Sequence, residues 1–94
     1  MEAGGGRLER RVTIVNPKGL HARAAAKFVK TAGAFDARVQ VAREDVTAGG
    51  TSILGLMLLA AGIGTGLTLR AEGPEAEAAL DALAGLVGSG FGEM

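Results

Sequence analysis

The chain has 94 residues, contains no cysteine and carries a formal net charge of zero. A chain of this length forms one domain, and without cysteine it has neither a disulfide framework nor a thiolate metal site. The longest nearly unbroken apolar run, residues 53–63, is too short to cross a bilayer. We expect a flexible leader at residues 1–8 and a single domain at residues 9–94. We also expect a cytoplasmic location without membrane insertion, since no signal-peptide pattern is visible.

The charged residues are unevenly distributed along the chain. Residues 1–43 hold nine basic and three acidic side chains, a net charge of +6. Residues 44–94 hold one basic and seven acidic side chains, a net charge of −6. Two interpretations stay open. The two halves form solvated faces of opposite sign, or the basic half steers acidic partners toward the single histidine, His21.

Hydrophobic periodicity predicts the elements in chain order. Alternation over residues 10–15 indicates a strand, and a break at residues 16–19 follows. From Ala22 the apolar residues recur at helical spacing until Gly33, which predicts a helix. The remaining predicted elements are strands at residues 37–42 and 46–48, a helix at 52–60 capped by Thr51 or Ser52, a strand at 67–71, and a last helix with Pro74 in its first turn that Gly88 and Gly90 end.

The predicted order is β-α-β-β-α-β-α, and each element has one apolar face. The economical arrangement is an α+β fold, in which a four-stranded antiparallel sheet is covered on one side by three helices. Only three aromatic residues occur, so aliphatic side chains must fill the core.

His21 is the first candidate for a functional residue, because it lies between a turn and the start of a predicted helix. Imidazole is nucleophilic near neutral pH, and a helix N-terminus stabilises a phosphoryl group with its free N–H groups. Arg23 adds a guanidinium fork that matches phosphate oxygens, and Gly19 allows a tight turn. The residues alone leave open that His21 is an incidental cap or surface residue. A metal site is not expected, since a second histidine and cysteine are both missing.

Two segments resemble the HPr family, the histidine phosphocarriers of the bacterial phosphoenolpyruvate-dependent phosphotransferase system. The family's active-site segment is matched by residues 19–23 and 25–30, GLHAR and AAKFVK, and its regulatory-serine helix by residues 52–57, SILGLM. The ending Ser89-Gly90-Phe91 continues the match, which covers roughly residues 10–92. The resemblance implies an open-faced β-sandwich and a carrier without a cofactor, rather than an independent enzyme.

The resemblance also implies roles for particular residues. His21 would accept phosphate on Nδ1 from phosphorylated Enzyme I and pass it to an EIIA-type protein. Arg23 would stabilise the phosphohistidine. Ser52 would be the regulatory site of an HPr kinase/phosphorylase, although serine is also a common helix cap. The protein would then be a phosphoprotein that acts as a monomer in sugar transport or nitrogen regulation.

A docking surface is expected beside His21, because the helix after Ser52 is apolar on all sides. Leu56 and Leu59 should face the core, which leaves an exposed apolar patch typical of a partner site. The expected docking residues are Ile53, Leu54 and Met57 from this helix and Ala22, Lys27 and Lys30 from the first helix. The alternative is that the apolar residues pack under a neighbouring loop.

The chain departs from the family at Ala24, where HPr proteins usually have proline. Alanine is an excellent helix former, so the site chemistry should survive. Together with the Leu-Met-Leu-Leu run at residues 56–59 and the Ser-Gly-Phe ending, Ala24-Ala25-Ala26 looks more like nitrogen-type regulatory carriers than sugar-transport ones.

Two other functions are compatible with a small α+β domain that has one histidine. A non-catalytic regulatory binding module could use the same small α+β fold, but nucleic acid is not an expected ligand because the strands lack stacking aromatics. A small acid–base enzyme could use His21, but no convincing carboxylate partner is legible near it.

Overall fold

The computed structural model describes residues 7–93. These residues form four strands, three α-helices and one short 3-10 turn. The elements are β1 (Leu8–Thr13), α1 (Ala22–Gly33), β2 (Arg38–Arg43), β3 (Val46–Gly49), α2 (Ile53–Leu58), β4 (Gly66–Glu72), α3 (Ala76–Gly88) and η1 (Gly90–Gly92). This is the predicted order, with the turn η1 added after the last helix.

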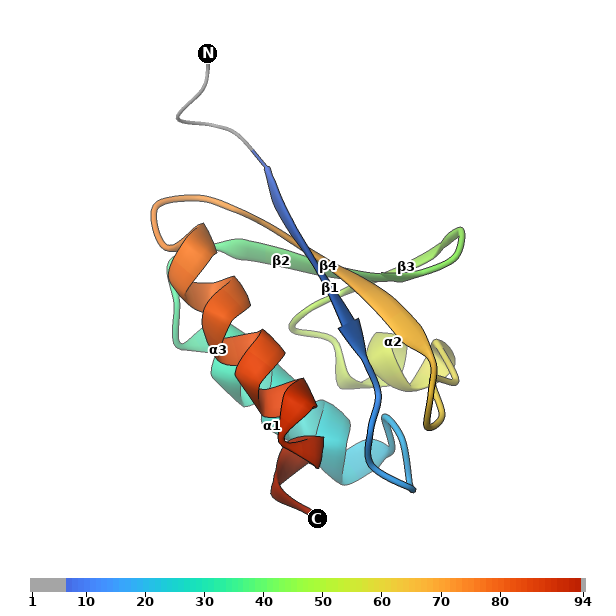
Figure 1. Cartoon of the computed structure of the whole chain (residues 1–94). Helices are drawn as coiled ribbons and strands as arrows, with labels where there is room; N and C mark the ends of the chain where they lie inside the picture. Colours follow the sequence, from blue (N-terminus) through green and yellow to red (C-terminus); the bar gives the residue numbers. More distant parts are fainter. Residues whose placement is uncertain (1–6, 94) are drawn as a thin grey trace.

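The four strands form one antiparallel sheet in the order β1-β4-β2-β3. The three helices cover one face, with α1 and α3 side by side, and the other face stays open (Figure 1). The register places Leu69 of β4 opposite Val41 of β2, and both side chains are fully buried. The predicted open-faced sandwich is therefore confirmed.

The core lies between the sheet and the helices and is mainly aliphatic. Every second residue of β4 is buried, as the alternation of Leu67, Leu69 and Ala71 predicts. In α3 the apolar residues that recur at helical spacing are all buried: Ala76, Ala79, Leu80, Leu83 and Val87. In α1 the stripe is buried at Ala25, Phe28 and Ala32 and half-buried at Val29. Within residues 7–93, no helix has the length and apolarity needed to span a bilayer.

Element boundaries differ from the sequence expectations: β1 ends at Thr13 instead of residue 15, α2 spans Ile53–Leu58 instead of residues 52–60, and two starts differ as well. β1 begins at Leu8, the last residue of the expected leader, because β4 is long enough to pair Leu8 with Ala71. Residues 1–6 of that leader lie outside the described residues. Pro74 is not in the first turn of α3, because Glu75 is the N-cap and its N–H donates to the Asp36 carbonyl at 3.0 Å.

Candidate functional site

His21 is the N-cap residue of α1, with an extended backbone and a partly exposed side chain. Its carbonyl accepts the first helical bond from the Ala25 N–H at 2.8 Å, while its ring does not cap the helix. The imidazole is therefore free to make contacts outside α1. The N–H groups of the first turn remain available beside it, as at any helix N-terminus.

Gly19 shapes the turn that presents His21. Its φ of +65° lies in the left-handed region, and a Cβ here would collide with the Ala61 carbonyl and come within 2.9 Å of Gly62 Cα. The neighbouring Leu20 N–H donates to the same Ala61 carbonyl at 2.9 Å. The turn before α1 therefore packs closely against the segment that follows α2, and glycine at position 19 permits this close approach.

A carboxylate lies directly against the histidine. Glu93 Oε2 is 2.5 Å from His21 Nε2, and Glu93 Oε1 accepts from Asn16 Nδ2 at 2.9 Å. Asn16 is fully buried, and its Nδ2 also donates to the Gly19 carbonyl at 2.9 Å. Both carboxylate oxygens are thus held, one by the histidine ring and one by a buried amide.

The expectation that no carboxylate accompanies His21 is therefore wrong. Glu93 is 72 residues away along the chain and reaches the ring only because the chain folds back after α3. Figure 1 shows the C-terminal end beside the loop between β1 and α1. Partial burial opposes ionisation of Glu93, but the hydrogen bonds from His21 and Asn16 outweigh it and hold its pKa below the ordinary value.

Lys27 fixes the segment that carries Glu93. Its ammonium donates to the Phe91 carbonyl at 2.6 Å, and its side chain is half-buried. Phe91 is itself buried, with a left-handed φ of 58°. We call Asn16, His21, Lys27 and Glu93 the histidine cluster. Lys27 was expected to contact partners, and the structure gives it this internal bond as well.

Cationic side chains surround a shallow hollow next to the histidine cluster. The hollow has a volume of about 350 Å³ and is lined by Pro17, Lys18, Arg23, Lys27, Gly92 and Glu93. The Arg23 side chain is exposed and makes no hydrogen bond within residues 7–93. Its guanidinium can therefore turn toward an anion on His21. Lys18, which the sequence did not single out, adds a second exposed cation to this hollow.

The expected regulatory serine caps α2. Ser52 is exposed, and its Oγ accepts from the Gly55 N–H at 2.9 Å. Leu56 and Leu59 are buried as predicted, whereas the other large apolar residues of the helix are exposed. We call this exposed set the α2 surface, formed by Ile53, Leu54, Met57 and Leu58. The alternative, that the predicted docking residues pack under a loop, is therefore wrong.

Of the remaining expected docking residues, Ala22 and Lys30 are exposed on α1. Ala24, which stands where the family usually has proline, is fully buried in the core. The turn before α1 and the helix itself form without that proline, because alanine suits a helix interior.

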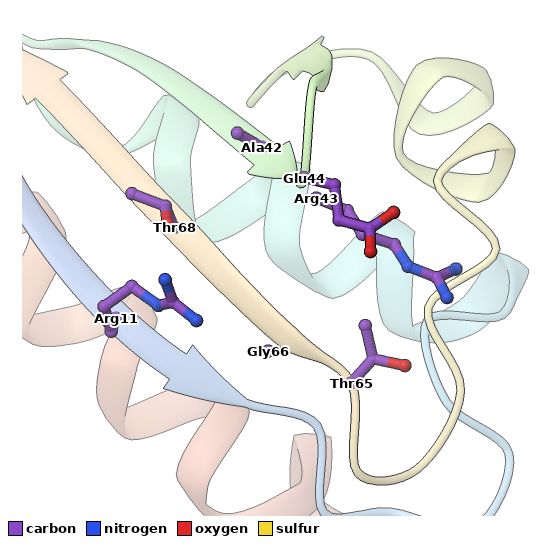
Figure 2. A pocket seen from close by; sticks show the side chains of 7 residues that line it. All are labelled: Arg11, Ala42, Arg43, Glu44, Thr65, Gly66 and Thr68. Atoms are coloured by element: carbon purple, nitrogen blue, oxygen red, sulfur yellow. The ribbon is translucent and has the colours of Figure 1, made fainter.

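A second hollow lies on the open face of the sheet, away from the predicted site residues. It has a volume of about 380 Å³ and is lined by Arg11, Ala42, Arg43, Glu44, Thr65, Gly66 and Thr68 (Figure 2). Arg43 is already bonded to the Leu59 and Ala60 carbonyls at 2.9 and 2.8 Å. The two hollows share no lining residue, so this one is separate from the chemistry at His21.

The histidine cluster is suited to holding a transferable group. Nε2 is occupied by Glu93, and Nδ1 has no hydrogen bond within the described residues. A nucleophilic nitrogen, a helix N-terminus and two exposed cations, Lys18 and Arg23, meet at one place on the surface. This combination favours capture of a phosphoryl group over chemistry in a closed cavity.

Comparisons with known proteins agree with this arrangement. The family model for the phosphotransferase-system HPr component phosphorylation site matches residues 8–89. The phosphocarrier protein HPr of Cupriavidus necator is 46% identical over 86 residues, covering 92% of this chain and 97% of that protein. The phosphocarrier protein NPr of Shewanella violacea is 46% identical over 87 residues, covering 93% and 96%.

A solved structure shows the same fold. The crystal structure of HPr-C-His from Thermoanaerobacter tengcongensis superposes with a TM-score of 0.88 at 40% identity, covering 93% of this chain and 98% of that one. Sequence, family model and fold agree over nearly the whole chain. The chain therefore belongs to the HPr family of the phosphotransferase system, whose members are phosphocarriers and not independent enzymes.

Proposed function

We propose that the protein accepts a phosphoryl group on His21 from phosphorylated Enzyme I and donates it to an EIIA-type protein. Family membership supports the class of reaction. The observation that carries the assignment is the geometry of His21, which lies at the start of α1 with Nε2 bound to Glu93 and Nδ1 open. As the family implies, Nδ1 is the acceptor atom.

Arg23 stabilises the phosphorylated state. Its exposed guanidinium lies in the first turn of α1, two residues after His21, and lines the same hollow as Lys18. A guanidinium fork can bind two phosphoryl oxygens at once, and the free N–H groups of the helix add further donors. The charge on the phosphoryl group is thus balanced without a metal or a cofactor.

Partner proteins dock across α1 and the α2 surface. Ala22 and Lys30 are exposed on α1, and the hydrogen bond from the Leu20 N–H to the Ala61 carbonyl ties the loop before α1 to the segment that follows α2. An exposed apolar area with a methionine is typical of a surface that meets more than one partner. Arg23 and Lys30 are exposed and basic on α1, which favours acidic partners.

Ser52 serves as an off-switch when an HPr kinase phosphorylates it. Ser52 is exposed and directly precedes Ile53, the first residue of the α2 surface. A phosphate on Ser52 would therefore add a charge of about −2 at the edge of that surface. We expect Ser52→Asp to slow transfer from Enzyme I about tenfold while the helix content stays unchanged. Thr47→Asp, which adds the same charge on β3, should transfer normally. Unchanged transfer in Ser52→Asp would remove the regulatory role.

We place the protein in the cytoplasm and in the nitrogen-regulatory branch. The three alanines at residues 24–26, the run at residues 56–59 and the ending at residues 89–91 support the branch. The HPr of C. necator and the NPr of S. violacea are equally similar to the chain, at 46% identity each. Comparing the rates of donation to a nitrogen-type and a sugar-type EIIA protein tests this assignment, and faster donation to the sugar type would reverse it.

The carrier function is tested by incubating the protein with phosphoenolpyruvate and Enzyme I. We expect a mass gain of one phosphate that is lost in acid, because phosphohistidine is acid-labile. The gain should vanish in His21→Ala and persist in Ser52→Ala, which separates histidine from serine chemistry. A protein that gains no phosphate, or a gain that persists without His21, would overturn the proposal.

A further inference from the structure

We infer that Glu93 is a positioning residue for phosphoryl transfer, which keeps the proton of His21 on Nε2 so that Nδ1 remains the nucleophile throughout the cycle. The inference rests on the proposed carrier function and assigns a role that family membership alone does not give to this residue. Glu93 would act through the histidine ring and would not touch the phosphoryl group.

The carboxylate is held in place by groups on several elements. Asn16 Nδ2 donates to Glu93 Oε1 and to the Gly19 carbonyl, both at 2.9 Å, and Asn16 is fully buried. With two acceptors on one side, the amide of Asn16 has only one satisfactory orientation. The second carboxylate oxygen is thereby directed at His21 Nε2, 2.5 Å away.

The backbone that carries Glu93 is fixed as well. The Glu93 N–H donates to the Gly90 carbonyl at 3.0 Å and closes the turn η1. Phe91 is buried beneath this turn, and Lys27 of α1 donates to its carbonyl at 2.6 Å. The segment at residues 90–93 is therefore attached to the helix that His21 begins, which sets the distance between carboxylate and ring.

The protonation states follow from the hydrogen bond. An ionised carboxylate can only accept, so Nε2 must be the donor. Glu93 is ionised at neutral pH, because its burial is outweighed by the hydrogen bonds that lower its pKa, and the charge of Lys27 acts in the same direction. In a neutral imidazole with its proton on Nε2, the lone pair is on Nδ1, where the described residues make no hydrogen bond.

This arrangement completes both transfer steps without moving a proton. In the first, the Nδ1 lone pair attacks phosphorus, and the donor's P–N bond breaks with its electron pair left on the donor nitrogen. His21 then carries the phosphoryl group on Nδ1 and the proton on Nε2, a cationic ring facing the Glu93 carboxylate. In the second step, the acceptor attacks, the P–Nδ1 bond breaks, and the pair returns to Nδ1.

The same contact favours donation as well as capture. Without a carboxylate, the phosphorylated ring could lose its Nε2 proton, and the departing group would then be an imidazolate, which is a poor leaving group. Glu93 stabilises the protonated ring, so neutral imidazole departs. We therefore expect Glu93 to affect the rate of transfer in both directions.

The test compares the wild-type protein with Glu93→Gln, which keeps the size of the side chain and removes its charge. Nitrogen NMR of histidine-labelled protein reports the tautomer before phosphorylation, and phosphorus NMR afterwards reports which nitrogen is modified. We expect the wild type to hold the Nε2–H tautomer and carry phosphate on Nδ1. We expect Glu93→Gln to populate both tautomers and to transfer about tenfold more slowly in each direction.

Two further variants separate positioning from a general effect. Glu93→Asp keeps the charge and should recover part of the tautomer preference, whereas Glu77→Gln, on the exposed side of α3, should behave as wild type. If Glu93→Gln keeps both the Nε2–H tautomer and the wild-type rate, the role of Glu93 is overturned while the carrier function stands. If the wild type takes no phosphate from Enzyme I, the carrier function and this role fall together.

Discussion

The histidine cluster and the α2 surface lie in the same helical layer but are built in opposite ways. In the cluster, four polar side chains are partly or fully buried, and each makes a directed contact of 2.5–2.9 Å. On the α2 surface, four large apolar side chains are exposed, and Leu54 keeps 68% of its accessible area. The histidine cluster holds its side chains in fixed positions, whereas the α2 surface exposes apolar area for contact.

The difference corresponds to two tasks of a carrier. A reacting nitrogen must lie in one orientation, since small displacements of reacting groups cost large factors in rate. A docking surface for successive partners must instead adapt, which apolar side chains without directional bonds allow. Changes in the cluster should therefore alter the rate at saturation, and changes on the α2 surface should alter affinity.

The largest effect is expected from Gly19→Ala, which breaks the link between the two regions. The new Cβ would collide with the Ala61 carbonyl and force a left-handed residue, so we expect the free energy of unfolding to fall by about 2–4 kcal/mol. Urea unfolding measures this change. Gly33→Ala, where a Cβ meets nothing within 4 Å, should stabilise by about 0.5–1 kcal/mol. Equal effects of the two variants would contradict the strained turn.

Arg23→Ala should separate chemistry from folding. The Arg23 side chain is exposed and makes no hydrogen bond within residues 7–93, so stability should change by less than about 0.5 kcal/mol. Transfer at saturating Enzyme I should slow about a hundredfold, since a charge-assisted donor to phosphate is lost. Rapid-quench kinetics measures the rate. Arg23→Lys should recover only part of it, because lysine lacks the planar fork. A normal rate in Arg23→Ala would remove its assigned role.

Ile53→Ser tests whether the α2 surface acts through affinity. Its matched control is Leu8→Ser on β1, since both side chains are 42% exposed and lose the same kind of apolar area. We expect Ile53→Ser to raise the KM for Enzyme I about tenfold with little change in kcat, and Leu8→Ser to leave both unchanged. Steady-state phosphorylation assays give both constants. A fall in kcat alone would place Ile53 with the chemistry instead of the docking surface.

Local sequence patterns were sufficient for most of the fold. Alternation in β4 and the helical stripe of α3 predicted the buried residues, because each pattern depends on neighbours within one element. The boundaries of β1 and α3 were misplaced, since they depend on partners from other elements: Leu8 pairs with Ala71, and Glu75 with Asp36.

The sequence predicted the site residues that lie close together in the chain, but not the residue that reaches the site from another element. His21, Arg23 and Gly19 are adjacent in sequence, so their combination could be read directly. Glu93 reaches His21 across 72 residues and through a left-handed Phe91, and no local pattern encodes that return. The available signal was the family-like ending Ser89-Gly90-Phe91, which stops two residues short of the carboxylate.

The smallest expected effect concerns acid stability and bears on the charge in the histidine cluster. The folded-state pKa of Glu93 is lowered, so its stabilising contribution is fully present above the ordinary carboxyl value of 4.5 and is lost as the pH falls through the lower folded value. The wild type should therefore be more stable than Glu93→Gln at neutral pH, and the two should converge in acid. The pKa of Glu9 is also lowered, by its hydrogen bond from Arg70, but both proteins share that pair and it cancels. Urea unfolding from about pH 7 to about pH 3 measures the difference. If the two proteins were equally stable at every pH in this range, the shape of the Glu93 side chain, and not its charge, would fix the histidine.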